Sequence, residues 1–131
     1  YAYAGHDMSL PWHFLSKRHN LRMDEYGGSL ENRVRLFREL IEDTKDAVGD
    51  RCAIAVRLAV DELLGDSGIT SDGEGRDIIA MLAELPESVV KHVWFQQSYG
   101  HFDFVLGTDA PVHLYPEVID VLQAHLAGDF D

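Results

Sequence analysis

The feature that most constrains the fold is a short apolar run, Cys52 to Val60 (CAIAVRLAV), which stands between two helical patterns. Such a run is typical of a strand that is buried on both faces of a parallel sheet. One alternation holds the larger side chains, which we expect to pack under helices: Ile54, Val56, Leu58 and Val60. The other forms a narrow face that can point into a barrel: Ala53, Ala55, Arg57 and Ala59. The sequence therefore predicts an α/β fold with parallel strands, and places Arg57 toward the carboxyl end of this strand, where β/α barrels build their sites.

The helical pattern before this strand lies between Ser29 and Gly49. Its stripe recurs at helical spacing through Leu30, Val34, Phe37, Leu40, Ile41, Thr44 and Val48. Ser29 can cap the first turn, and Gly49 stands where a C-terminal glycine is favoured. We predict one helix over 29–48 with its apolar stripe, including Phe37, against the sheet.

The other segments continue the alternation of strand, loop and helix. We predict a long ordered loop over Met8 to Gly28 and an acidic, glycine-rich loop over Asp61 to Gly75. A helix is expected from Arg76 to Leu85, a strand from Val89 to Phe95, and a last helix from Pro116 to Leu126 with the proline in its first turn. The predicted order is strand, loop, helix, repeated along the chain.

Composition excludes several classes of protein. The single cysteine, Cys52, leaves no internal disulfide and no zinc or iron–sulfur site built from several thiolates. The formal net charge of -12, from 23 acidic and 11 basic residues, repels nucleic acid and anionic membranes. With no bilayer-spanning apolar run and no secretory leader, we expect a soluble, cytoplasmic protein. No metal site is predicted, because five histidines lack metal-ligand spacing: His13, His19, His92, His113 and His125.

A ten-residue block carries a family resemblance. Asp24 to Arg33 (DEYGGSLENR), with Phe14-Leu15-Ser16 before it and Ala55-Val56-Arg57 after it, resembles the FMN-dependent old yellow enzyme superfamily. The similarity covers about residues 1–85 and is greatest for the branch of the trimethylamine and dimethylamine dehydrogenases. It implies part of a β/α (TIM-type) barrel, FMN as cofactor, and a small amine or enone as substrate.

The resemblance also implies roles for three residues. Tyr3 and His6, in Tyr3-Ala4-Gly5-His6, match the residues beside substrate and flavin, where a phenol and an imidazole can tune the protonation of an amine. Arg57 matches the arginine against the flavin ring. The alternatives remain open: Tyr3 as a strand aromatic, His6 as a loop residue, and Arg57 as a buried arginine paired with Glu31 or Asp61.

Structural roles are expected for four residues of the ten-residue block. We predict that Glu31 and Arg33 fix the loop and the start of the helix, and that Gly27 and Gly28 provide tight backbone geometry.

Much of the flavin site is expected to lie elsewhere. A whole β/α barrel needs about 250 residues, and the sequence shows no phosphate-binding β/α units and no partner aspartate from a later strand. We therefore expect an interior barrel fragment that neither binds FMN nor turns over substrate alone, and that self-associates through exposed sheet edges or covers them with its tail.

The last third suggests a different family. Residues 85–126, through Tyr99-Gly100-His101-Phe102-Asp103-Phe104 and Asp109-Ala110-Pro111, resemble the carboxyl end of the acid lipases, which are α/β-hydrolases. The resemblance makes His101 the candidate triad base, although Gly65-Asp66-Ser67-Gly68-Ile69 is not a nucleophile elbow. We therefore expect a barrel segment over 1–85 and a hydrolase-like segment over 86–131, in one compact unit. A lipase-like hydrolase and a non-catalytic structural or engineered hybrid remain the alternatives to the flavin enzyme.

Overall fold

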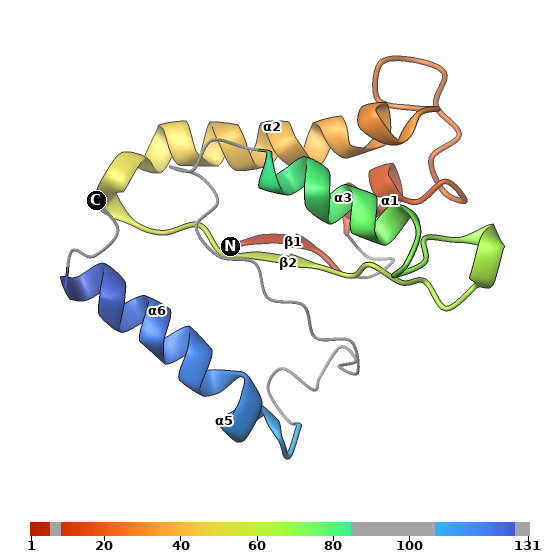
Figure 1. The fold of residues 1–131 in the computed structure, drawn as a ribbon. Coiled ribbons are helices and arrows are strands. Elements are labelled where there is room, and N and C mark those ends of the chain that lie inside the picture. Colours follow the sequence, from red (N-terminus) through yellow and green to blue (C-terminus); the bar gives the residue numbers. More distant parts are fainter. Residues whose placement is uncertain (6–8, 85–106, 128–131) are drawn as a thin grey trace. The chain divides into compact units, whose positions relative to one another are not determined.

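The computed structural model describes residues 1–5, 9–84 and 107–127, which fall into two compact units, Tyr1–Val93 and Trp94–Asp131. The first unit contains, in chain order, β1 (Ala2–Ala4), α1 (Leu10–Leu15), α2 (Leu30–Val48), the 3-10 turn η1 (Gly49–Arg51), β2 (Val56–Leu58), the 3-10 turn η2 (Gly65–Ser67) and α3 (Glu74–Ala83) (Figure 1). Among the described residues, no helix has the length and apolar character needed to cross a membrane.

The sheet of the first unit consists of β1 and β2, which pair in parallel. Ala2 lies opposite Val56, Tyr3 opposite Arg57, and Ala4 opposite Leu58. The helices α2 and α3 lie on the same side of the two strands in Figure 1. This small parallel sheet with covering helices agrees with the predicted α/β class.

The helix α2 confirms the prediction for residues 29–48. Ser29 caps it by accepting a hydrogen bond from the backbone N–H of Asn32, and Gly49 ends it with φ of 55°. Val34, Phe37 and Ile41 are buried on its inner face, where Phe37 is only 1% exposed. A local cap, a terminal glycine and an apolar stripe are sufficient to define these boundaries.

The strand β2 is shorter than predicted. It spans Val56–Leu58 and not Cys52 to Val60, and it is not buried on both faces, because Val56 is 40% exposed and Arg57 is half-buried. A strand extends only where a neighbour pairs with it, and β1 itself has three residues. The predicted alternation holds for Leu58, which packs against the core together with Ala2 and Ala4.

The prediction of a continuous loop over Met8 to Gly28 is wrong in its first part. The six-residue helix α1 lies within this segment, and its residues Trp12 and Leu15 are buried. Pro11 occupies the first turn, and Trp12 and Leu15 are spaced as on one face of a helix. This pattern extends over too few residues to predict a helix from the sequence.

The remaining loop, from Ser16 to Gly28, is ordered as expected. The side-chain Nδ2 of Asn20 donates to the backbone oxygens of Phe14 and Tyr26, each at 2.7 Å. Gly28 has φ of +80°, and a Cβ on Gly27 would lie 2.1 Å from the carbonyl oxygen of Arg22. The predicted backbone role of both glycines is confirmed.

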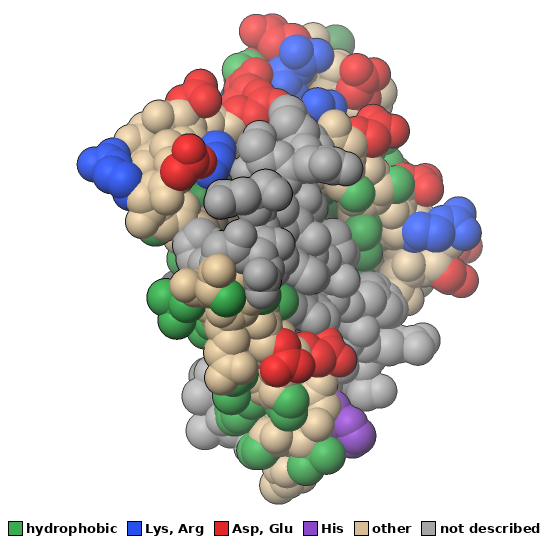
Figure 2. All heavy atoms as spheres, turned by 60° about the vertical axis from the view of Figure 1, so that its left-hand side comes forward, with side chains coloured by type: hydrophobic (Ala, Val, Ile, Leu, Met, Phe, Trp, Pro, Cys, Tyr) green, Lys and Arg blue, Asp and Glu red, His purple; other side chains and the backbone are tan. Residues whose placement is uncertain are grey.

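The other helices follow the predicted pattern. α3 (Glu74–Ala83) begins two residues before the predicted Arg76. In the second unit, α5 (Ala110–His113) precedes α6 (Tyr115–Ala127), which contains the predicted helix from Pro116 to Leu126. Ile119, Leu122 and Leu126 are exposed, and apolar side chains are visible on the surface in Figure 2. The strand predicted from Val89 to Phe95 lies outside the described residues.

Candidate functional site

The face of the β1–β2 sheet opposite α2 and α3 is called the open face, because none of the described helices of the first unit covers it (Figure 1). It brings two of the predicted site residues together. Tyr3 and Arg57 are partners in the β1–β2 register, and the guanidinium carbon of Arg57 lies 5.8 Å from the centre of the Tyr3 ring. Tyr1 stacks on Tyr3, with ring centres 6.1 Å apart and an interplanar angle of 25°. An arginine over an aromatic face is attracted by the ring quadrupole, which orients both side chains.

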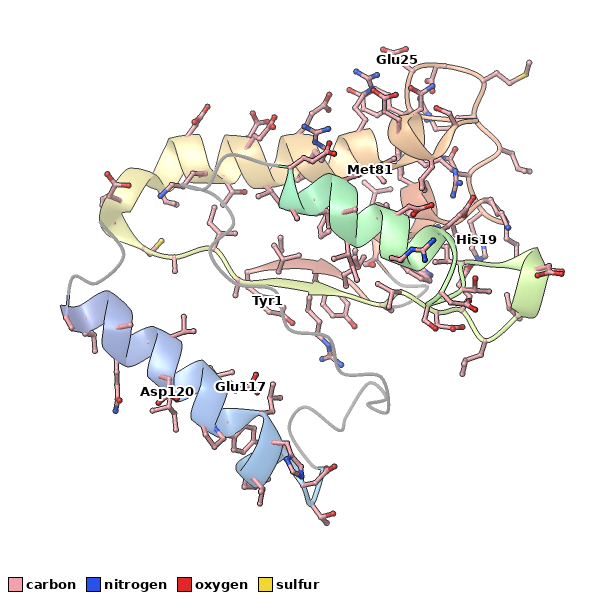
Figure 3. The ribbon with its side chains drawn as sticks, viewed as in Figure 1. Tyr1, His19, Glu25, Met81, Glu117 and Asp120 are labelled. Carbon is pink, nitrogen blue, oxygen red and sulfur yellow. The ribbon has the colours of Figure 1, made fainter. Side chains whose placement is uncertain are left out.

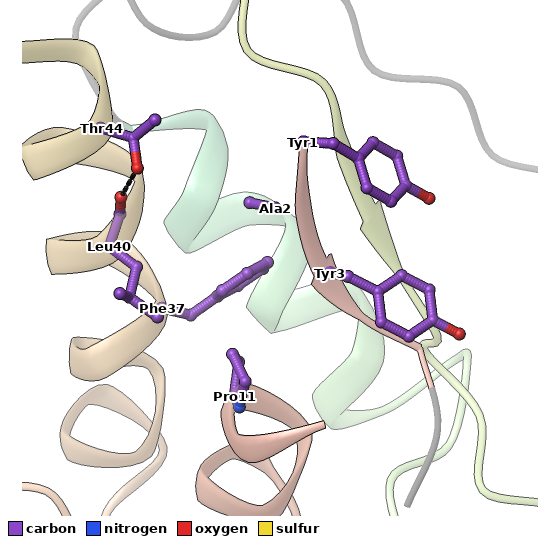
Figure 4. A pocket seen from close by; sticks show the side chains of 7 residues that line it. All are labelled: Tyr1, Ala2, Tyr3, Pro11, Phe37, Leu40 and Thr44. Atoms are coloured by element: carbon purple, nitrogen blue, oxygen red, sulfur yellow. Dashed lines mark hydrogen bonds between the residues drawn. The ribbon is translucent and has the colours of Figure 1, made fainter. Parts of the chain in front are cut away.

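Strand alternation explains why these side chains share a face. Ala2 and Ala4 turn toward the core, and Ala4 is fully buried, so Tyr1 and Tyr3 turn the other way. Figure 4 shows both tyrosine rings pointing away from Phe37, and Figure 3 shows Tyr1 on the side of the strands opposite α3. The open face therefore carries a positive charge held over a stack of aromatic rings.

The carboxylate of Asp61, one proposed partner of Arg57, serves the loop after β2. Its oxygens accept hydrogen bonds from the backbone N–H groups of Leu63, at 2.7 Å, and Ser71, at 3.1 Å. These bonds, first the one from Leu63, lower the pKa of Asp61 below its usual value. Asp61 therefore has a local role in closing this loop.

The buried arginine of the first unit is Arg33, not Arg57. Arg33 is 3% exposed, and its guanidinium donates to the carbonyl oxygens of Leu15 and Gly28 and to the Glu74 carboxylate, the last at 2.7 Å. It joins the end of α1, the loop before α2 and the start of α3. The structural role predicted for Arg33 is confirmed, whereas Glu74 was missed, because nothing local marks a partner 41 residues away.

A shallow pocket lies beside β1, between this strand, α1 and α2 (Figure 4). Its volume is about 210 Å³, and it is lined by Tyr1, Ala2, Tyr3, Pro11, Phe37, Leu40 and Thr44. Cofactor pockets usually measure roughly 300–1,000 Å³ and enclose most of the ligand. This pocket is too small to enclose a flavin, so the described residues could form at most one wall of an FMN site, with Arg57 as the predicted contact.

Two predicted site residues, His6 and His101, lie outside the described residues. In the part of the chain that the structure describes, no group of three or more His, Cys, Asp or Glu side chains could hold a metal ion. His13 and His19 stack on each other, with ring centres 5.0 Å apart. His19 lies in the loop between α1 and α2, as does Glu25 (Figure 3).

Comparison with known proteins identifies the family. Residues 5–102 match the model of the NADH:flavin oxidoreductase / NADH oxidase family. The chain is 44% identical over 71 residues to NADH oxidase of Thermoanaerobacter brockii, and 42% identical over 65 residues to dimethylamine dehydrogenase of Hyphomicrobium sp.. These matches cover 54% and 48% of this chain, and 11% and 9% of the relatives.

A solved structure supports the same assignment. The chain superimposes on histamine dehydrogenase from Rhizobium sp. 4-9 with a TM-score of 0.58 and 48% identity, over 65% of this chain and 12% of that one. The chain thus spans about a tenth of the length of these proteins. It belongs to the NADH:flavin oxidoreductase / NADH oxidase family, and within the old yellow enzyme superfamily it fits the trimethylamine and dimethylamine dehydrogenase branch.

The family match also bears on the last third. It ends at residue 102, and so includes the first part of the segment compared above with acid lipases. The lipase-like interpretation with its base His101, and the division after Leu85, stay predictions.

Proposed function

We propose that this chain forms one wall of the flavin site of an FMN-dependent amine oxidoreductase. Arg57 faces the flavin ring, and Tyr3, together with His6, faces the amine. The observation that carries the proposal is the Tyr3–Arg57 pair, held in register on the open face of the β1–β2 sheet in a chain of this family. The substrate class is that of the amine-oxidising relatives.

The chemistry of the pair fits this role. Bound FMN supplies the hydride acceptor of the family's reaction. A fixed guanidinium next to a ring that gains negative charge stabilises that charge without reorganisation. The Tyr3 phenol can hydrogen-bond an amine nitrogen, and the His6 imidazole can hold a proton there, since histidine titrates near neutral pH. Arg57 and Tyr3 orient each other through the contact described above.

We further propose that the 131-residue chain neither holds FMN nor turns over amines, enones or esters by itself. The pocket beside β1 is too small for a flavin, and the formal net charge of -12 disfavours an anionic phosphate. Flavin catalysis needs a closely held ring, because a misplacement of about 1 Å can cost roughly a hundredfold in rate. Sheet edges that other barrel strands would cover can instead pair between two copies.

The first experiment adds FMN to the purified chain and follows fluorescence quenching, with assays of trimethylamine, a simple enone and a short-chain ester. No saturable quenching and no turnover are expected. Multiple turnovers that vanish in His6→Ala would show a complete flavin site in this chain. Turnover that vanishes only in His101→Ala would assign the chain to the hydrolases.

A second experiment tests the role of Arg57 directly. The matching segment of histamine dehydrogenase is replaced by the corresponding residues of this chain, which is feasible at 48% identity. Arg57→Met in this exchange should lower the flavin reduction potential and weaken FMN binding about tenfold, because one charge contact to the reduced ring is lost. Arg76→Met, at an exposed position, is the matched control. An unchanged flavin spectrum and potential in Arg57→Met would remove Arg57 from the site.

A further inference from the structure

Glu62, in the loop between β2 and α3, makes hydrogen bonds within its own loop and to one distant residue of the first unit. Its backbone N–H donates to the carbonyl oxygen of Ile69 at 2.9 Å, and its Oε2 accepts from the backbone N–H of Ile69 at 2.7 Å. Its Oε1 accepts from the Ser16 hydroxyl at 2.8 Å. One carboxylate therefore closes its own loop and binds a residue 46 positions earlier.

These contacts join the segments that follow the two strands. Ser16 comes directly after α1, which belongs to the segment after β1, whereas Glu62 and Ile69 belong to the segment after β2. Ser16 and Ile69 are both fully buried. A Cβ on Gly68 would lie 2.7 Å from the Oε2 of Glu62, so a glycine at this position allows the carboxylate to lie close to the backbone of the loop. The two hydrogen bonds of the Glu62 carboxylate are partly buried, and a lower local dielectric makes such bonds stronger than exposed ones.

The two strands need such a connection. Each has three residues, and a short two-stranded pair is marginal without further support. The last backbone hydrogen bond between the paired segments runs from Ala59 N–H to the carbonyl oxygen of Ala4 at 3.1 Å. Beyond it, two side-chain contacts among the described residues join the segment after β1 to the segment after β2. The Arg33–Glu74 ion pair joins α2 to α3, and the Ser16–Glu62 hydrogen bond joins the residue after α1 to the loop after β2.

We propose that Glu62 is a positioning residue of the candidate flavin site. By joining the segments after β1 and β2, it keeps Tyr3 opposite Arg57 on the open face. The importance of Glu62 for catalysis rests on the proposed function. Its contacts, and their effect on the Tyr3–Arg57 pair, can be tested in this chain without a flavin.

The test uses NMR of the full chain without FMN. Glu62→Met removes both acceptor oxygens at similar side-chain length. Glu62→Gln loses the same charge, but its amide oxygen can accept from Ile69 while its amide nitrogen donates to the Ser16 hydroxyl. Ser16→Ala breaks only the connection between the two segments. The readouts are the exchange rates of the Ile69 and Phe37 amides, the Arg57 Nε–H resonance and the Tyr3 ring resonances.

In Glu62→Met, we expect the Ile69 amide to exchange at least about tenfold faster, because its buried acceptor is lost. The Phe37 amide should stay within about twofold, since the opening is local, and the Arg57 and Tyr3 resonances should shift. Glu62→Gln should restore all of these values. Ser16→Ala should shift the Arg57 and Tyr3 resonances while leaving the exchange rate of the Ile69 amide unchanged. If Glu62→Met does not fold, Ser16→Ala alone tests the positioning role.

Two results would overturn the proposal: Arg57 and Tyr3 resonances that do not move in Ser16→Ala, or Phe37 exchange that accelerates as much as Ile69 exchange in Glu62→Met. The second would show that Glu62 contributes only to overall stability. Because no flavin is present, these outcomes are independent of the segment-exchange experiment with histamine dehydrogenase. A failure of the positioning role and a failure of the proposed function are therefore distinguishable.

Discussion

The two sides of the β1–β2 sheet hold their arginines in different ways. On the helix side, Arg33 is almost completely buried and donates to two backbone carbonyls and to Glu74. On the open side, Arg57 is half-buried and lies over the ring of Tyr3. The chain thus contains one arginine enclosed by acceptors from three segments, and one presented on a face lined by aromatic rings.

This difference shows how to separate structural from functional arginines. Removing a buried arginine leaves backbone acceptors and a partly buried carboxylate without their donor, which costs stability. Removing an arginine from a partly exposed aromatic face costs much less, because such a cation–π contact contributes about 0.5–1 kcal/mol. Stability should therefore depend mainly on the helix side, whereas the proposed flavin contact involves the open side.

The largest effect is expected for Phe37→Ala on the helix side. Phe37 is 1% exposed in the core beneath α2, and deleting a buried aromatic side chain typically costs about 3–5 kcal/mol. Urea denaturation monitored by circular dichroism measures the loss. Leu40→Ala, on the same helix but 40% exposed, is the control and should cost clearly less. An unchanged midpoint in Phe37→Ala would remove Phe37 from the core.

The next effect is expected for Arg33→Met. Arg33 is buried, but the Glu74 side chain is 29% exposed, so removing Arg33 should cost up to about 3 kcal/mol, the lower end of the range for a buried ion pair. The loss arises because Glu74 and the carbonyls of Leu15 and Gly28 lose their donor. Arg76→Met is the matched control, since the Arg76 side chain is 73% exposed and its contact with Asp77 is long, at 3.8 Å. Equal urea midpoints for the two variants would contradict the structural role of Arg33.

A smaller effect is expected for Arg57→Met. The cation–π contact with Tyr3 at a partly exposed site contributes about 0.5–1 kcal/mol, so the urea midpoint should fall only slightly. The comparison between the two arginines fails if Arg57→Met destabilises the chain as much as Arg33→Met does. That result would make Arg57 a second structural arginine, as the pairing with a carboxylate predicts.

The smallest effect concerns Asp61 and depends on pH. Hydrogen bonds from the Leu63 and Ser71 backbones lower the pKa of Asp61 in the folded state. Its stabilisation is therefore complete above the pKa of an unfolded aspartate, about 3.9, and is lost as the pH falls through the lower folded pKa. Asp61→Asn should be less stable than the wild type near pH 6, and the difference should shrink toward about pH 3.

Arg57→Met sharpens this last test. If backbone hydrogen bonds cause the shift, the pH dependence of stability that Asp61 contributes should persist in Arg57→Met. Its disappearance in that variant would instead assign Asp61 as a partner of Arg57.

The sequence by itself determined the parts that rest on local signals. Ser29, Gly49 and the apolar stripe between them predict α2 to within one residue, because helix hydrogen bonds and caps join residues only a few positions apart. The block from Asp24 to Arg33 indicated the family, and it also named Arg57 and Tyr3 as site residues. Their roles remain proposals, but their presence on one sheet face followed from strand alternation.

Only the tertiary structure decided the contacts between distant segments. The end of β2 at Leu58, the Arg33–Glu74 ion pair and the Ser16–Glu62 hydrogen bond each depend on a partner at least 41 residues away in sequence. Strand length and ion pairing are set by which neighbour lies alongside, and no local spacing encodes that neighbour. For the same reason, the contact between the Arg57 guanidinium and the ring of Tyr3 is visible only in the folded chain.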